Sequence, residues 1–255
     1  MGEQPVAAAE NQAVIEPRRG KREELLPSRA ILAFTPQDVE LVQHQAPLLR
    51  QGPQGIYLTK LFVGSCRGVP LVLAGPMLGA PQAVLVLEKM IALGVTEVIA
   101  AGWCGSLQPQ VEIGHLVLPT GAFSEEGTSA HYPIATPRPG PSPELLAPLQ
   151  AALSGQGGTV HQGMVWSTDA PFRETVGKVM QYQKAGALAV EMEMAAMFTA
   201  AVFRRVRLAA VLAVSDDLSS LAWVHGFRKP AFRKAREGMI EAIITVVSRE
   251  QEMKG

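Results

Sequence analysis

Apolar runs with strand character alternate with amphipathic stretches along most of the chain, and this alternation limits the possible folds more than any other feature. Ala30 to Phe34 and Glu97 to Ala101 have the pattern of buried strands, whereas Gln82 to Leu93 repeats apolar residues at helical spacing. Such alternation is typical of an α/β protein, in which helices cover a parallel or mixed sheet. The turn at Arg67-Gly68 predicts a hairpin, so we expect a mixed sheet.

Composition fits one domain with a large core, since the chain has 255 residues of which 47% are hydrophobic. We expect residues 1–27 to form a flexible arm and residues 28–255 to form the domain. The 23 basic and 23 acidic residues balance, which argues against a nucleic-acid-binding surface. No apolar run approaches the roughly 20 residues of a membrane span, and no apolar signal segment begins the chain.

Cysteine and histidine usage adds two expectations. Cys66 and Cys104 are too few for a disulfide framework and are interpreted as reduced thiols of a cytoplasmic protein. The five histidines show no ligand spacing with cysteine or acid, so we expect no metal site.

The strongest functional signal is Ala187 to Ala196, where strand-forming residues give way to a helix-forming segment. Glu191 and Glu193 lie at this change, with apolar residues on both sides. Ionised carboxylates are costly to bury unless they are paired or hydrogen-bonded. Ligands of open α/β sheets bind at the carboxyl ends of strands, so a functional role is one interpretation. The alternative is an ordinary strand-to-helix turn in which the two acids face the helix dipole.

A second apolar strand, Leu208 to Val214, also ends in acid, at Asp216 and Asp217. A short glycine turn, Gly102 to Ser106, follows the strand at Glu97. This turn is not a dinucleotide fingerprint, because it lacks the GxGxxG spacing and the acid that would follow.

Five motifs in this order resemble the nucleoside phosphorylase family, which includes purine nucleoside phosphorylases, uridine phosphorylases and methylthioadenosine nucleosidases. They read GPMLGAP, AAGWCGS, EGTSAHY, AVEMEMAA and AVSDD. The resemblance covers most of residues 30–245. It implies a single α/β domain whose central mixed sheet is partly closed into a barrel and flanked by helices. It also implies a nucleoside and phosphate as substrates, no cofactor, and a homo-oligomer, either a dimer or a trimer of dimers.

The resemblance implies roles for four residues of the last two motifs. Glu193 matches the carboxylate that accepts hydrogen bonds from the ribose hydroxyls and stabilises positive charge developing on the sugar. Met192 matches the residue that packs under the sugar, and Glu191 a position in the base pocket. Asp216 matches the general acid that protonates a purine at N7. Asp217 is interpreted as a solvated or capping neighbour.

Two further segments fall where the family contacts its substrate. In the stretch STDAPFR, Phe172 is expected to stack on the base and Arg173 to hydrogen-bond a carbonyl of it. His131 and Tyr132 lie in a loop that the resemblance places near a sugar or base site, including that of a neighbouring subunit. For a lone loop histidine, surface decoration is the alternative.

The nucleophile is the point at which the chain departs from the family. Family phosphorylases hold phosphate with an arginine in a glycine-containing loop after the first strand, but the loop FTPQDVE has neither residue. We expect Thr35, Gly102 and Ser106 to provide neutral donors in a nucleophile pocket that also includes Trp103. The nucleosidase branch uses a glutamate in the first loop to activate water, and Asp38 falls close to that position.

Three hypotheses therefore stay open. The first is a nucleoside phosphorylase, with purines favoured by Asp216 and uridine possible. The second is a nucleosidase that hydrolyses the same bond with Asp38 as the base. The third, suggested by Trp103, is a catalytically silent nucleoside-binding protein.

Overall fold

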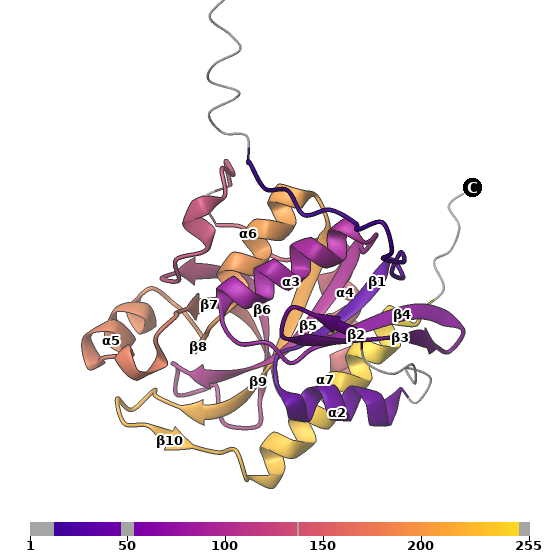
Figure 1. Cartoon of the computed structure of the whole chain (residues 1–255). Coiled ribbons are helices and arrows are strands. Elements are labelled where there is room, and N and C mark those ends of the chain that lie inside the picture. The colour runs from indigo at the N-terminus through magenta and orange to yellow at the C-terminus, as the bar shows by residue number, and fades with distance from the viewer. Residues whose placement is uncertain (1–12, 47–53, 137, 250–255) are drawn as a thin grey trace, which may run out of the picture.

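The computed structural model of the chain describes residues 13–46, 54–136 and 138–249. The strands of these residues are β1 (Arg29–Ala33), β2 (Gln54–Ile56), β3 (Thr59–Cys66), β4 (Val69–Gly75), β5 (Glu97–Ser106), β6 (Leu116–Ser124), β7 (Val160–Ser167), β8 (Ala189–Glu191), β9 (Arg207–Asp217) and β10 (Val224–His225). They form one sheet in the order β10-β9-β6-β7-β8-β5-β1-β4-β3-β2, and β9 also pairs with β5. That second pairing closes β9, β6, β7, β8 and β5 into a barrel, which the other strands extend (Figure 1).

The helices lie on both sides of this sheet (Figure 1). They are α2 (Pro36–Gln45), α3 (Ala80–Ala92), α4 (Pro143–Ser154), α5 (Val176–Lys184), α6 (Met194–Arg204) and α7 (Pro230–Val247), with short 3₁₀ turns η1 (Ser129–His131) and η2 (Pro171–Arg173). Helices α3 and α6 pack together over one face, and α2, α4 and α7 cover the other. None of the described helices is both long and apolar enough to cross a membrane.

Successive residues of the central strands point into different cores. In β1, Ala30 and Leu32 pack with α3 and α6, whereas Ile31 and Ala33 pack with α2, α4 and α7. This two-residue period explains why strands buried on both faces read as continuous apolar runs. The sheet is mixed, because β5 is parallel to β1 and β9 while β3 and β4 form an antiparallel hairpin. The predicted α/β domain with a partly closed mixed sheet is confirmed.

One turn lacks the usual glycine, and one local expectation needs correction. Between β2 and β3, Tyr57 has a φ of 55° and turns the chain without a glycine. The glycine turn expected at Gly102 to Ser106 belongs to β5 instead, with an irregular register between Cys104 and Gly105. Its glycines serve close packing, since a Cβ on Gly102 would lie 2.8 Å from the ring of Phe34.

The described part of the N-terminal arm, residues 13–27, is held against the domain rather than free of it. Glu16 forms an ion pair with Arg204 of α6, and Glu23 forms one with Lys89 of α3. The backbone amide of Leu26 donates to the carbonyl at the end of α3. In Figure 1 this segment runs along the outside of α3. Residues 1–12 lie outside the described residues.

Candidate active site

A cavity of about 430 Å³ opens where the ends of β5, β8 and β9 meet. The register of the barrel brings these ends together, because Gly105 of β5 pairs with Val190 of β8 and with Asp216 of β9. The lining combines apolar and aromatic side chains with three carboxylates: Trp103, Cys104, Gly105, Pro171, Phe172, Glu174, Val190, Glu191, Met192, Ser215, Asp216, Leu218, Trp223 and Phe227. An apolar pocket with a few convergent polar groups is the usual form of a small-molecule site.

Glu191 has two roles at once, because it lines the cavity and anchors the start of α6. One oxygen accepts a hydrogen bond from the Ser167 hydroxyl, and Oε2 accepts the backbone amides of Glu193 and Met194 at 2.6 and 2.8 Å. The interaction with the first turn of a helix is therefore present, as the structural interpretation expected. Burial nonetheless raises the pKa of Glu191 to about 7.

Glu193 is also buried, with 7% of its surface exposed, but it faces a different element. Its Oε1 accepts the backbone amide of Gly79 at 2.7 Å, in the loop that leads into α3. Burial, followed by the negative charge of Glu191, raises the pKa of Glu193 to about 8. Glu193 does not line the 430 Å³ cavity, whereas its neighbour Met192 does. Of the two residues assigned to the ribose, Met192 therefore lines this cavity and Glu193 lies behind it.

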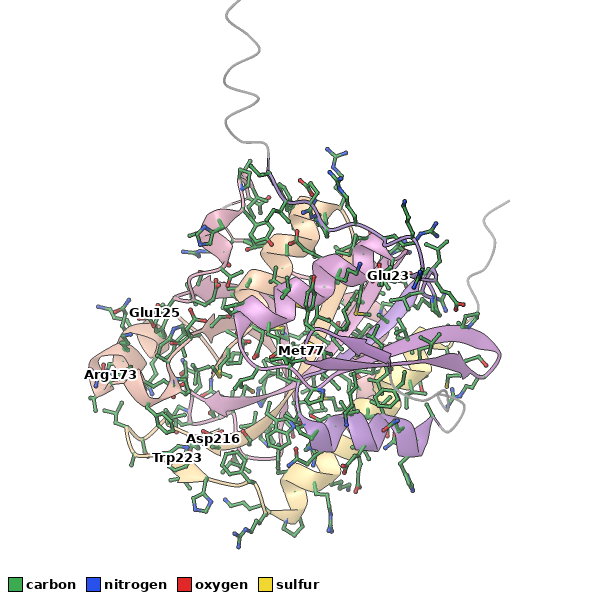
Figure 2. All side chains as sticks on the ribbon, in the orientation of Figure 1. Glu23, Met77, Glu125, Arg173, Asp216 and Trp223 are labelled. Carbon is green, nitrogen blue, oxygen red and sulfur yellow. The ribbon has the colours of Figure 1, made fainter. Side chains whose placement is uncertain are left out.

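Asp216 lies at the cavity wall with a donor on each oxygen. The Ser215 hydroxyl donates to Oδ1 at 2.6 Å, and the indole N–H of Trp223 donates to Oδ2 at 2.9 Å. Figure 2 shows Asp216 and Trp223 side by side. Asp217 instead accepts the backbone amide of Ser219 at 2.7 Å, in agreement with its interpretation as a capping neighbour.

The sequence interpretation missed Glu174, which lines the same cavity as Asp216. Burial, followed by the negative charge of Asp216, raises the pKa of Glu174 to about 7. A group with such a pKa holds a proton in part of the molecules at neutral pH, so it can donate or accept. A sequence signal was available, because Glu174 directly follows the stretch STDAPFR, which was expected to contact the base.

The two residues expected to contact the base are separated by the structure. Phe172 lines the cavity, although 99% of its surface is exposed, so it is available at the mouth. Arg173 is exposed and does not line the cavity, and Figure 2 places it at the outer edge of the molecule. The expectation that Arg173 reads a base carbonyl is therefore not supported in this conformation, because its side chain points away from the pocket.

The nucleophile pocket expected from Thr35, Gly102, Trp103 and Ser106 does not form. Only Trp103 lines the cavity. Thr35 caps α2 by accepting the backbone amide of Asp38. Gly102 is buried between Phe34 and Leu212, and the buried Ser106 hydroxyl donates to the carbonyl of Gln108. These three residues serve the barrel packing and the turns around it.

Asp38 is the center of a buried network rather than a base open to water. It is 0% exposed, and its Oδ1 accepts Nε–H of Arg236 at 2.7 Å. Its Oδ2 accepts the indole N–H of Trp103 at 2.6 Å and the Thr35 hydroxyl at 3.0 Å. The Arg236 guanidinium also lies 5.0 Å from the Trp103 ring center. The expectation that Asp38 activates water is corrected, because its acceptors are occupied and it is closed to solvent.

His131 and Tyr132 line a second cavity of about 1040 Å³. It lies between η1, α3, α6 and the arm residues Ala13–Glu16, and it includes neither Asp216 nor Glu191. Burial, followed by the charge of Glu88, raises the pKa of Tyr132. In a single chain these two residues therefore do not contribute to the 430 Å³ cavity. Among the described residues, no group of three or more His, Cys, Asp or Glu side chains is placed to hold a metal ion.

Comparison with known proteins identifies the family. The family model of the phosphorylase superfamily matches residues 28–248. The chain belongs to the phosphorylase superfamily. It is 32% identical over 159 residues to a guanosine phosphorylase of Halorubrum lacusprofundi, a match that covers 62% of this chain and 66% of that relative. A DeoD-type purine nucleoside phosphorylase of Jannaschia sp. is 30% identical over 62% of this chain and 68% of its own length.

Solved structures show the same fold at lower identity. A uridine phosphorylase of Vibrio fischeri superposes with a TM-score of 0.75 at 23% identity, covering 88% of this chain and 91% of that one. A purine nucleoside phosphorylase of Toxoplasma gondii in complex with immucillin-H superposes with a TM-score of 0.78 at 18% identity, with the same coverage. Both structures therefore share the fold described above with this chain.

Proposed function

We propose that this protein cleaves the N-glycosidic bond of a purine nucleoside and transfers the sugar to phosphate, without a resident cofactor. The observation that carries the proposal is that Asp216, Glu191 and Met192, from two separate motifs, line one cavity at the joined ends of β5, β8 and β9. The relatives named guanosine phosphorylase and purine nucleoside phosphorylase support the same reaction.

In this reaction an oxygen of phosphate attacks C1′ as the bond to the base breaks. The electron pair leaves with the base, and Asp216 protonates it at N7, which makes the base a better leaving group. Glu193 holds the ribose hydroxyls and stabilises the positive charge that develops on the sugar. Met192 packs against the sugar. Phe172 at the mouth and Glu174 inside the cavity contact the base, together with Glu191.

Replacement of Asp216 tests the acid assignment. Asp216→Asn keeps the shape but cannot deliver the proton, so purine nucleoside cleavage should fall at least about tenfold, which corresponds to roughly 1.4 kcal/mol of barrier. Asp217→Asn is the matched control, because Asp217 bonds only a turn amide and the amide oxygen of asparagine can still accept it. Equal turnover of both variants and the wild-type protein would remove Asp216 from the mechanism.

Hydrolysis is the second candidate, and the charge of the cavity favours it. Among the described residues that line the cavity there are three carboxylates and no lysine, arginine or histidine. Phosphate recognition normally uses arginine forks or backbone amides. Base release from a nucleoside panel, measured with and without phosphate, separates the two reactions. Tight nucleoside binding with no turnover under either condition would instead support the silent binding protein.

We further propose a cytoplasmic homo-oligomer, a dimer or a trimer of dimers. The two cysteines are unpaired and buried, which suits a reducing compartment. The 1040 Å³ cavity carries the exposed apolar side chains of Ile15, Leu85 and Phe203, which a second subunit would cover. Light scattering after size-exclusion chromatography tests this, and a monomer at micromolar concentration would contradict it.

A further inference from the structure

Residues 218–229, which we call the strap, directly follow Asp217 and contribute to the lining of the 430 Å³ cavity. Three of its residues, Leu218, Trp223 and Phe227, line the cavity. The strap returns along β9 through β10, in which Val224 pairs with Asp217 and His225 with Asp216.

One point of the strap is firmly fixed. The backbone amide of Gly226 donates to the carbonyl of Ser215 at 2.8 Å, and a Cβ on Gly226 would lie 2.3 Å from the side chain of Ile113. Three residues earlier, Trp223 is held much less. Trp223 is 64% exposed, and its ring contacts the rings of His225 and Phe227, both within the strap. Its bond to the rest of the site is the hydrogen bond to Asp216.

The hydrogen bond from the indole N–H of Trp223 to Asp216 resembles the one that the N7–H of a released purine would make. In the reaction proposed above, the base ends as a bicyclic ring whose five-membered part carries N7–H beside Asp216. Indole is also a bicyclic ring with one N–H on its five-membered part, and it donates to Asp216 Oδ2 at 2.9 Å. A base nitrogen must come within about 2.6–3.2 Å of the carboxyl oxygen for proton transfer, so both rings compete for one place.

We propose that Trp223 is an internal stand-in for the base, and that a purine displaces its indole from Asp216 on binding. Trp223 thereby sets the affinity and the ring preference of the pocket without entering the chemistry. The inference rests on the proposed function for the identity of the ligand. Its test uses binding alone, so it does not depend on turnover.

The decisive variant is Trp223→Phe, which keeps an aromatic ring and removes the N–H donor. Without the competing hydrogen bond, hypoxanthine should bind at least about threefold more tightly than to the wild-type protein, measured by calorimetry. His225→Leu is the matched control, since His225 packs against Trp223 but neither lines the cavity nor bonds the Asp216 side chain. The Kd of this control should equal that of the wild type, which separates donor loss from a loosened strap.

Fluorescence gives a second, independent measurement. Saturation with hypoxanthine should shift the wild-type tryptophan emission to longer wavelength as the Trp223 indole moves further into water, and the shift should be smaller in Trp223→Phe, in which Trp103 still lines the cavity. An unchanged or weaker affinity in Trp223→Phe, or no binding of the base to either protein, would overturn the proposal. If no nucleoside is cleaved but these binding differences appear, the proposed function fails while the role of Trp223 stands.

Discussion

The buried pair of Asp38 and Arg236 allows a quantitative prediction. Arg236→Leu removes the cation and leaves Asp38, at 0% exposure, with only the Thr35 and Trp103 donors. Breaking a buried ion pair from one side costs about 3–5 kcal/mol. We take the lower end, about 3 kcal/mol, because these two donors remain. For a chain of this size each kcal/mol lowers the Tm by about 2–4 °C, so the Tm should fall by about 6–12 °C.

Asp38→Asn is the informative counterpart, because it removes the charge but keeps an oxygen that can accept the Trp103 N–H. The Arg236 side chain remains 14% exposed and can reach water. The free energy of unfolding should therefore fall by only about 1–2 kcal/mol. Burial also raises the pKa of Asp38. The stability that Arg236→Leu loses relative to the wild-type protein should therefore become smaller as the pH falls and Asp38 takes up a proton.

Thermal and urea unfolding, followed by circular dichroism, measure the Tm and the free energy of unfolding of both variants, and base release measures their activity. The folded Asp38→Asn protein should keep its turnover within about threefold, which is less than 1 kcal/mol of barrier. An Arg236→Leu protein as stable as the wild type would refute the energetic reasoning. Loss of all hydrolytic activity in a folded Asp38→Asn protein would refute the structural role and restore Asp38 as the base.

Three further predictions concern charge and packing. Because the pKa values of Glu191 and Glu193 are raised, the folded state binds more protons than the unfolded state from about pH 4.5 to 8. The free energy of unfolding should therefore fall as the pH rises through this range. Urea unfolding should show a smaller fall in Glu193→Gln. Gly105→Ala should cost about 1–3 kcal/mol in thermal or urea unfolding, because its Cβ would lie 2.6 Å from Leu218. If phosphate enters the cavity, its KM should increase from pH 6 to 8 as Glu174 ionises, and a constant KM would place phosphate elsewhere.

Local patterns and motif order predicted most of the fold and part of the site. The hairpin at Arg67-Gly68 was predicted, because a hairpin turn depends on a few adjacent residues. The sequence also placed Glu191 and Asp216 at the ends of two strands, and the barrel brings those strand ends together. Family membership followed from the same residues.

The parts that the sequence did not predict depend on contacts between distant segments. Asp38 and Arg236 are 198 positions apart. The sequence therefore did not show that Asp38 forms an ion pair, and Asp38 was interpreted as a free base. Gly102 looked like a loop residue, although the barrel needs it where Phe34 crosses closely. Arg173 and Glu174 are neighbours in the chain, but Arg173 is exposed and Glu174 lines the cavity. No periodicity in the sequence distinguishes the two residues.

The charges in and around the cavity affect which nucleophile can enter it. Arg236 is the cation beside Trp103, but Asp38 already neutralises it, and therefore it adds little attraction for an anion in the cavity. The carboxylates that line the cavity repel a phosphate anion, whereas they stabilise a positively charged sugar whichever nucleophile attacks it. Water carries no charge and avoids that repulsion. A phosphate that does react must be held by backbone amides or by groups outside this lining. Of all the properties of the protein, the need for phosphate is therefore the one for which the charge of the cavity has the clearest consequence.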